Sequence, residues 1–453
     1  MITTRKRIWG WFFFDWASQP YNTLIITFIF APFMKDLLGD GTAAQTVWGY
    51  GVGFAGIIIA LSSPFLGAIA DRSGRRIPFI WIFSAMYVIG AAGLWYAAPG
   101  SFSLTFVMTS FIIGLIGMEF ATTFTNAMLP DLAPRSEIGK VSGSGWAFGY
   151  LGGMLLLIVM LALFQINPDT GRTLVGLPPL FGLDLAARED TRIVGPLTAL
   201  WYAVFMIPFF LWVREPHHAG AIPIRQAARG AWPELKSTLK TLPGQRSLFS
   251  YLLSSMFYRD ALNGIYTFGG IYAAGVLGWS IIQIGIFGIL GTITGAIFAW
   301  LGGKADDRFG PKPVIIATVL LLTAVVVGVV FISRTSVFGI ATGPDSALPD
   351  IAFYVMGGLI GAGGGVLQSA SRTMMVRQAD PAKITEHFGL YALSGKATAF
   401  IAPLSIGAMT QLTQSQSAGI TPIIVLFLIG LILLGFVKAN GDHRPTPEGG
   451  TAP

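Results

Sequence analysis

Residues 67–76 read GAIADRSGRR, and residues 303–312 read GKADDRFGPK. Five positions of these stretches match at a constant separation of 236 residues, about half of the 453-residue chain. The matched positions are Gly67, Asp71, Arg72, Gly74 and Arg76 in the first stretch, and Gly303, Asp307, Arg308, Gly310 and Lys312 in the second. Glycine permits tight turns, aspartate caps neighbouring helices, and basic residues favour an anionic membrane surface. The repeat predicts equivalent loops in two related halves.

The sequence around these loops is too apolar for a water-soluble protein. Apolar residues make up 53% of the chain and charged residues 11%, against about 25% charged in an ordinary soluble domain. A membrane-spanning helix needs about 20 mostly apolar residues. Twelve such runs occur, at 8–33, 46–70, 77–98, 102–129, 141–165, 192–213, 248–277, 280–302, 312–333, 351–376, 386–412 and 421–438. The runs lack the alternation of membrane strands, so we expect an all-α integral membrane protein with twelve transmembrane helices.

Lys and Arg are distributed unequally between the two sets of connecting segments. One set, which includes both termini, carries 21 of the 29, whereas the alternate set carries five. Because cytoplasmic segments are enriched in Lys and Arg, both termini are expected in the cytoplasm. The formal net charge of +7 is then a topology signal and does not indicate nucleic-acid binding. We expect a monomeric, multi-pass protein of the cell (inner) membrane.

The longest basic segment divides the twelve runs into six and six. The predicted organisation is an N-terminal six-helix bundle over residues 1–213, a cytoplasmic linker over 214–246, and a C-terminal six-helix bundle over 247–440. The polar tail over residues 441–453 is expected to be disordered.

The doubled loop on a six-plus-six plan resembles the major facilitator superfamily over nearly the whole chain. Shorter motifs resemble the branch related to the fungal vacuolar amino-acid effluxers of autophagy and their bacterial relatives. These motifs are residues 10–21 (GWFFFDWASQPY), 126–130 (NAMLP), 143–150 (GSGWAFGY), 368–372 (QSASR), 388–391 (FGLY) and 395–396 (GK). The resemblance implies two pseudo-symmetric halves, with the first, fourth, seventh and tenth spans lining a central cavity. Gln19-Pro20 departs from the branch, which commonly has two small residues there.

Two stretches imitate nucleotide-binding motifs without their structural context. Residues 51–56 (GVGFAG) fit a dinucleotide fingerprint but follow no predicted strand, and residues 389–397 (GLYALSGKA) miss the spacing and hydroxyl group of a P-loop. The chain has no Cys and four His, and no span contains a nucleophile–base pair. We therefore expect no metal, no cofactor and no enzymatic activity.

Six ionisable residues fall inside the expected spans, and each is expected to face an internal cavity. A charge at the bilayer centre costs at least about 2.5–3.5 kcal/mol unless it is paired or hydrated. Neutral polar residues stand at helical spacing from several of them, on the first, fourth, seventh and tenth spans. The predicted substrate or proton pathway is Asp15, Gln19, Asn22, Glu119, Asn126, Arg259, Asp260, Asn263, Gln368, Arg372 and Lys396. The alternative is an ion-pair network that only holds helices together, such as Asp15 or Glu119 with Arg372 or Lys396.

These patterns favour a secondary transporter of a small polar or zwitterionic, amino-acid-like solute working by alternating access. Without a nucleotide site the expected driving force is an ion gradient, with the proton as coupling ion and Glu119 or Asp15 as its carrier. The doubled loops are predicted to control conformational switching without touching the solute. The partners expected are the lipid bilayer and the solute. The alternative function is export of amphipathic compounds or lipids, which the aromatic residues of the first span would also suit.

Overall fold

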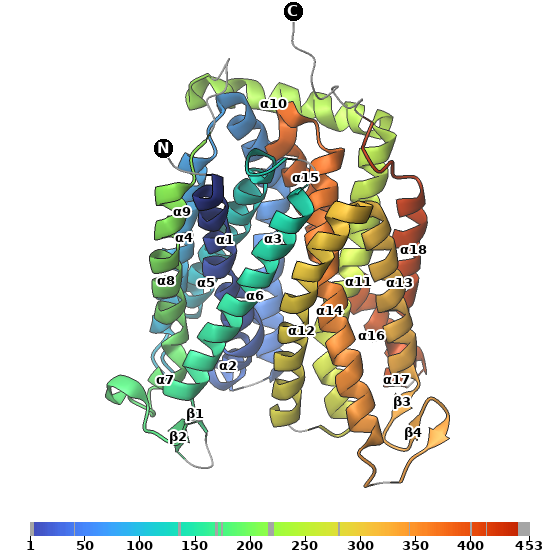
Figure 1. Ribbon diagram of the computed structural model, residues 1–453. Helices are drawn as coiled ribbons and strands as arrows, with labels where there is room; N and C mark the ends of the chain where they lie inside the picture. The colour runs from blue at the N-terminus through green and yellow to red at the C-terminus, as the bar shows by residue number, and fades with distance from the viewer. Residues whose placement is uncertain are drawn as a thin grey trace, which may run out of the picture.

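The computed structural model describes residues 4–39, 41–134, 137–167, 171–173, 175–215, 222–279, 281–343, 345–398, 401–413 and 415–442. It is a bundle of long helices that run side by side, with the two ends of the chain at the same end of the bundle (Figure 1). We call this end the terminal end. The opposite end carries the short strands and is called the hairpin end.

The first part of the chain forms nine α-helices and two short strands among the described residues. The elements are α1 (Thr4–Pro20), a π-helical stretch η1 (Tyr21–Phe28), α2 (Phe30–Leu38), α3 (Gly41–Ser73), α4 (Ile77–Gly93), η2 (Leu94–Tyr96), α5 (Leu104–Asn126), η3 (Leu129–Asp131), α6 (Ile138–Leu163), β1 (Ile166–Asn167), β2 (Arg172–Thr173), η4 (Leu180–Gly182), α7 (Glu189–Arg192), α8 (Val194–Phe205) and α9 (Ile207–Trp212). Strands β1 and β2 pair antiparallel, with Ile166 opposite Thr173.

The second part begins with a helix that lies across the terminal end (Figure 1). Its elements are α10 (Ile224–Thr241), η5 (Leu242–Gly244), α11 (Arg246–Val276), α12 (Ile281–Phe309), α13 (Pro311–Val330), β3 (Ile332–Ser333), β4 (Ser336–Val337), β5 (Ile340–Ala341), α14 (Leu348–Gln378), η6 (Pro381–Lys383), α15 (Ile384–Ala397), α16 (Ile401–Thr413), α17 (Gln416–Gly419) and α18 (Pro422–Gly435). Strands β3, β4 and β5 form an antiparallel sheet in that order.

Helices lie at all twelve expected spans, but the spans differ in how apolar they are. Nine helices of the described residues are long and apolar enough to cross a membrane. The expected spans outside this set are α1–α2, α11 and α15–α16. The first and last of these are interrupted, and α11 carries Arg259 and Asp260 in its middle.

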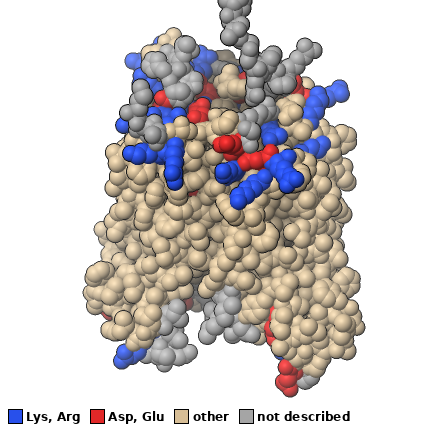
Figure 2. All heavy atoms as spheres, in the orientation of Figure 1, with Lys and Arg blue, Asp and Glu red and all other residues tan. Residues whose placement is uncertain are grey.

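The surface has the pattern of a membrane protein. Figure 2 shows Lys and Arg gathered toward the terminal end, above a broad belt of uncharged surface. Large apolar side chains are exposed on the bundle, including Leu61 at 73%, Ile432 at 65% and Leu412 at 82%. Such exposure would be costly in water, whereas lipid tails accommodate it.

The buried apolar side chains form two clusters. One is built on residues from Trp11 to Ala231, and the other mainly on residues from Leu242 to Val437. Near the terminal end the two parts of the chain touch closely, because a β-carbon on Gly143 of α6 would lie 2.8 Å from Cα of Gly303 in α12. The bundle is therefore tightly closed between α6 and α12 at this end.

The linker and the start of the tail are structured. Residues Ile224–Thr241 form helix α10, whose Ala227 and Ala231 are fully buried. Gly441 and Asp442, assigned to the tail from sequence, lie against the second part of the bundle, where Asp442 accepts a hydrogen bond from the backbone N–H of Ser247 at 2.9 Å. The remaining tail residues, 443–453, lie outside the described residues.

Candidate functional site

The side chain of Arg372 on α14 joins the two parts of the bundle. Its Nη1 donates to Asp15 Oδ2 of α1 and to Asn126 Oδ1 at the end of α5, both at 3.2 Å. Its Nε and Nη2 donate to the hydroxyl and carbonyl of Ser142 on α6, at 2.9 and 2.5 Å. Arg372 is 3% exposed. A buried guanidinium needs such partners on several sides, and here they come from three helices of the first part.

Two tryptophans enclose the same guanidinium. The Cζ of Arg372 lies 4.6 Å from the ring centroid of Trp11 and 5.5 Å from that of Trp146. A cation over an aromatic face is attracted by the electron-rich ring, and the attraction strengthens when water is excluded. Gly145 makes room for this arrangement, because a β-carbon there would lie 2.6 Å from both Asp15 Oδ2 and the Trp11 ring. We call this set of residues the Arg372 network.

A second cation lies deeper in the bundle, in the middle of α11. Arg259 Nη1 donates to the Tyr391 carbonyl of α15 at 3.1 Å, and its guanidinium lies 4.2 Å from the Tyr391 ring centroid. Gly395 permits this contact, since a β-carbon there would lie 2.7 Å from the guanidinium. Glu119 of α5 lies within electrostatic reach of Arg259. An acid of the first part of the chain is thus close enough to a base of the second to interact with it electrostatically.

Neutral polar groups of α6, α11 and α14 form a separate cluster. Gln368 of α14 donates to the Tyr150 hydroxyl of α6 at 2.8 Å, and Tyr266 of α11 also interacts with that hydroxyl. Tyr266 is 46% exposed, and Asn263, one turn earlier on α11, is exposed too. Because Tyr266 reaches α6, its exposed surface lies at the junction of the two parts of the bundle. Hydroxyl and amide groups there can bind a polar solute.

Asp260 and Arg259 are neighbours in sequence but contact different helices. Asp260 Oδ2 accepts a hydrogen bond from the Ala402 backbone N–H at 3.0 Å, at the beginning of α16. The described residues of the eleventh span form two helices, because α15 ends at Ala397 and α16 begins at Ile401. Asp260 is 2% exposed, and its Oδ1 has no hydrogen-bond partner among the described residues. Its contact is that of a cap on a helix that starts inside the bundle.

The polar residues of the first span point to different neighbours. Asp15 belongs to the Arg372 network, whereas Gln19 lies against Gly153 of α6. Asn22 donates to the Met118 sulfur of α5 at 3.9 Å and lies in the π-helical stretch. A π-helix shifts the faces that regular helical spacing would align, and such stretches are frequent at functional sites. The side chain of Lys396 lies outside the described residues.

Sequence reasoning misses three members of the Arg372 network. Trp11, Ser142 and Trp146 carry no charge and are absent from the pathway predicted from the ionisable residues. A signal does exist: Trp11 precedes Asp15 by four residues, and Ser142 precedes Trp146 by four, so each pair shares a helix face. Their contribution depends on where Arg372 lies, and that position is set by packing between distant spans.

The doubled loops connect the two parts of the bundle at the terminal end. Asp71 Oδ2 accepts a hydrogen bond from the Glu386 backbone N–H, near the start of α15, at 2.9 Å. Asp307 Oδ2 accepts one from the Lys140 backbone N–H, near the start of α6, also at 2.9 Å. Each aspartate thus lies at the positive end of a helix from the other part of the chain. The two copies of the sequence repeat therefore make equivalent contacts, each between an aspartate and the start of a helix from the other part of the chain.

The basic residues of the loops do not follow the same symmetry. Arg76 pairs with Asp71 and Asp131 at 3.2 Å and donates to the Thr385 hydroxyl of α15 at 2.7 Å. Its counterpart Lys312 donates to the Val437 carbonyl, just beyond α18, at 2.6 Å. Arg76 therefore ties the first loop to the other part of the chain, whereas Lys312 stays within its own part.

The other loop residues shape the turns or pack locally. Gly74 and Gly310 have φ angles of 61° and 83°, which favour glycine. Arg72 lies against Gly230 of α10, and Arg308 lies over the ring of Phe309. Gly67 lies against the backbone of Thr385 and Glu386 at the start of α15.

Comparison with solved structures identifies the fold. The major facilitator superfamily transporter FucP, in its outward conformation, aligns with a TM-score of 0.69 and 16% identity over 95% of this chain and 98% of its own. The proton:xylose symporter XylE aligns with a TM-score of 0.64 and 14% identity over 95% and 94%. The fold is that of the multi-pass transporters of the major facilitator superfamily.

Sequence comparison then identifies the family. The family described as "Vacuole effluxer Atg22 like" matches residues 43–444, and the chain belongs to it. The uncharacterized MFS-type transporter YxiO of Bacillus subtilis (strain 168) is 26% identical over 94% of both chains. Autophagy-related protein 22 of Cryptococcus neoformans is 24% identical over 68% of this chain and 52% of its own length, so the chain spans about half of that relative. The resemblance drawn from the loops and short motifs is confirmed.

Asp71→Asn is expected to increase the fraction of molecules in which the terminal end is open. The substitution removes the charge that faces the start of α15 and weakens the pair with Arg76. Transport should slow while equilibrium binding of the solute stays nearly unchanged, because Asp71 lies outside the candidate site. The natural chain has no Cys, so a Ser63→Cys reporter on buried α3 can be labelled with a water-soluble maleimide, and Asp71→Asn should speed labelling several-fold. Asp131→Asn, which removes the other Arg76 contact, is the control, and an equal effect of both would contradict the assignment.

Asp15→Asn is expected to lower the free energy of unfolding by about 3–5 kcal/mol, because it leaves a buried guanidinium without its counter-charge. The matched control is Asp36→Asn, which removes the partner of Arg188 in a pair at 2.6 Å whose aspartate side chain is 49% exposed. That change should cost no more than about 1 kcal/mol. Denaturant titration in detergent measures both, and similar losses would show that the Arg372 network does not stabilise the bundle.

Proposed function

We propose that this chain is a secondary transporter that moves a small polar or zwitterionic, amino-acid-like solute by alternating access. The observation that carries the proposal is the placement of Glu119 and Arg259, an acid and a base from opposite parts of the chain, at a junction with exposed polar side chains. A zwitterion presents an ammonium group to the acid and a carboxylate to the base. Tyr150, Tyr266 and Gln368 add neutral hydrogen-bonding groups.

The two acid–base pairs have different proposed roles. The Arg372 network lies toward the terminal end and uses the donors of its guanidinium on Asp15, Asn126 and Ser142. It therefore holds the two parts of the bundle together in this conformation. Among the described residues, Arg259 donates from Nη1 to one carbonyl and lies against one ring face. A guanidinium has five N–H donors, so we assign its other donors to an anionic group of the solute.

We place the terminal end in the cytoplasm and the monomeric chain in the cell (inner) membrane. The support for the orientation is the excess of Lys and Arg in the segments at that end. The proposed cycle alternates the closed terminal end with a closed hairpin end. Changing between these states requires the contacts of Asp71, Asp307 and Arg372 to separate together.

Transport competition tests the solute class. Proteoliposomes containing the purified chain are given a labelled mixture of L-amino acids under an imposed pH gradient, with and without tetraphenylphosphonium as a hydrophobic competitor. Uptake that is suppressed by unlabelled amino acids and unaffected by the hydrophobic cation supports the proposal. Binding can be measured in parallel, because a solute at 100 times its dissociation constant stabilises the fold by about 2.7 kcal/mol. Uptake blocked only by the hydrophobic cation would instead favour an exporter of amphipathic compounds.

Proton coupling through Glu119 gives a separate prediction. Glu119→Gln should abolish gradient-driven accumulation but preserve exchange of labelled for unlabelled solute, because exchange requires no net proton movement. Glu119→Asp keeps a carboxylate and should retain part of the accumulation. Asp15→Asn is the second candidate for the same phenotype. If neither Glu119→Gln nor Asp15→Asn affects uphill accumulation under a pH gradient, these carboxylates do not carry the proton.

A further inference from the structure

Asp306 is a buried acid at the terminal end that neither the candidate site nor the loop contacts use. It belongs to the second doubled loop, directly before Asp307, and is 0% exposed. Neither of its carboxyl oxygens has a hydrogen-bond partner among the described residues. Burying a carboxylate without partners is costly, so this environment favours the neutral, protonated form of the side chain.

Three helices enclose the carboxyl group of Asp306. Its own helix, α12, packs against α14 of the second part and against α6 of the first. On the α6 side, a β-carbon on Gly139 would lie 2.8 Å from both Cγ and Oδ2 of Asp306. On the α14 side, Thr373 lies beside Asp306, and its own hydroxyl donates to the Ser369 carbonyl at 3.4 Å. The carboxyl group therefore occupies space that a glycine leaves in the contact between the two parts of the chain.

Two charged neighbours act on Asp306 in opposite directions. Arg377 of α14 attracts an ionised carboxylate at this position, whereas Asp307 repels it. Their opposition leaves burial to favour the neutral form. The charged residues at this end of the enclosing and adjoining helices are Glu137 and Lys140 at the start of α6, Lys304, Asp307 and Arg308 on α12, Lys312 on α13, and Arg377 on α14.

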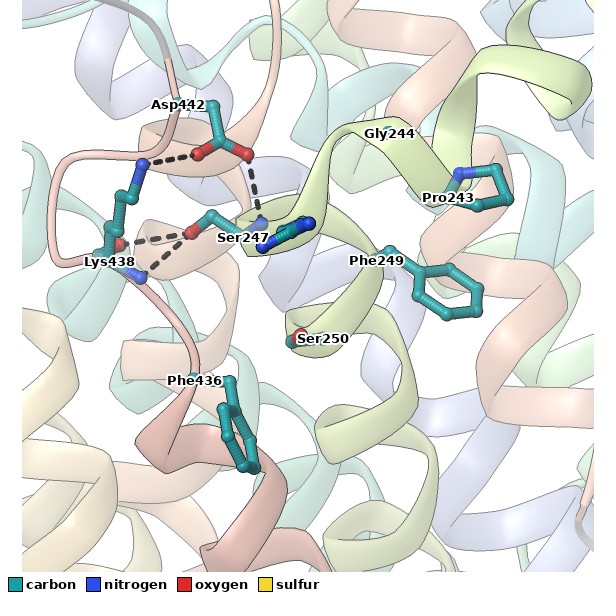
Figure 3. Close-up of a pocket in the computed structure, with 9 residues that line it drawn as sticks. Pro243, Gly244, Ser247, Phe249, Ser250, Phe436, Lys438 and Asp442 are labelled. Carbon is teal, nitrogen blue, oxygen red and sulfur yellow. Dashed lines mark hydrogen bonds and ion pairs between the residues drawn. The ribbon is translucent and has the colours of Figure 1, made fainter.

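The α14 side of the enclosure is bound to the rest of the second part. Gln378, at the end of α14, donates to the Lys438 carbonyl at 2.7 Å and accepts from the Ser247 hydroxyl of α11 at 2.6 Å. Figure 3 shows Ser247 beside Lys438 and Asp442, whose charged groups pair at 2.9 Å. Gly139, in contrast, belongs to the first part. When the two parts separate at the terminal end, Gly139 moves away and water reaches the carboxyl group.

The first doubled loop has alanine at the equivalent position. Ala70 stands 236 residues before Asp306 and is fully buried. The packing around the two positions is alike, because β-carbons on Gly67 and Gly303 would lie 2.6 and 2.5 Å from carbonyl oxygens of the other part of the chain. The two loops thus share a close contact between the parts of the chain, and the second adds a carboxyl group to it.

We propose that Asp306 is a proton-binding site, which holds a proton while the terminal end is closed and releases it to water when this end opens. A hydrated carboxyl group ionises well below neutral pH. A higher pH at the terminal end therefore favours the open state, and a lower pH favours the closed state. The proton is taken from and returned to the same side, so Asp306 sets the pH dependence of opening and does not carry a proton across the membrane. The inference rests on the alternating access proposed above.

Maleimide labelling of the Ser63→Cys reporter at several pH values tests the proposal, in chains with and without Asp306→Asn. Asparagine has the shape of the neutral carboxyl group but cannot ionise. Thiol reactivity itself rises with pH in both chains, so the rate without the substitution is divided by the rate with it. This ratio should rise from mildly acidic to mildly alkaline pH, by at most about ten-fold per pH unit for one released proton.

Two further variants serve as the matched pair. Asp306→Ala gives the second loop the alanine of the first and should abolish the pH dependence as Asp306→Asn does. Asp131→Asn removes another acid at the terminal end, one that is paired with Arg76. It should leave the pH dependence intact.

Infrared spectroscopy of the purified chain gives a readout that does not depend on opening. A neutral carboxylic acid has a carbonyl stretch that a carboxylate lacks. At mildly acidic pH this band should be weaker in both Asp306 variants than in the natural chain. Asp131→Asn should retain the full band, because the charge of Arg76 keeps Asp131 ionised.

Either of two results would overturn the proposal. One is a labelling ratio that stays constant with pH although the natural chain is labelled. The other is an infrared band of equal intensity in the natural chain and in Asp306→Asn, which would mean that the buried carboxyl group is ionised. Absence of labelling at every pH would contradict alternating access instead, and the infrared band would still decide whether Asp306 holds a proton.

Discussion

A guanidinium buried in a membrane protein must be neutralised and hydrogen-bonded by its surroundings, and the position of Arg372 imposes this constraint on the whole bundle. Its partners Asp15, Asn126 and Ser142 come from α1, α5 and α6, so the helices of the first part must converge on one helix of the second. Glycine at position 145 allows them to approach closely enough. The close contact of α6 with α12 lies beside the same point. The hydrogen bonds of Arg372 and the close packing of α6 on α12 thus stabilise the same conformation, in which the terminal end is closed.

The same contacts explain how a transporter can be stable and still change shape. The interactions between the two parts of the chain at the terminal end are polar and local: aspartates at helix starts, one arginine network, and close packing between glycines. Water can replace polar contacts when the interface opens, whereas a large apolar interface would have to be exposed at greater cost. Each of the two apolar clusters lies mainly on one side of residues 231–242, so little of their surface has to separate.

The sequence is sufficient to predict the twelve-helix fold, because the length of an apolar run is fixed by the thickness of the bilayer. The repeat of Asp71 and Asp307 similarly indicates two equivalent loops, and each aspartate makes the same kind of contact. Apolar run lengths and sequence repeats do not predict which buried charges pair with each other. Asp15 has two basic candidates among the expected spans, and only the packing of α1 against α6, which itself packs against α14, selects Arg372. The partner of Asp260 cannot be assigned because it is a helix beginning near Ile401, which is not visible in an apolar run.

The described residues of the eleventh span form two short helices, and their lengths have a consequence for how this span is held in the membrane. Helices α15 and α16 have 14 and 13 residues, so each extends roughly 20 Å, less than the hydrocarbon layer of about 30 Å. Neither piece can cross the bilayer alone, and the start of α16 needs an acceptor for its exposed N–H groups. Asp260 of α11 provides one such acceptor, because its Oδ2 accepts a hydrogen bond from the Ala402 backbone N–H. The eleventh span therefore depends on a carboxyl side chain of the seventh span for part of its backbone hydrogen bonding within the membrane.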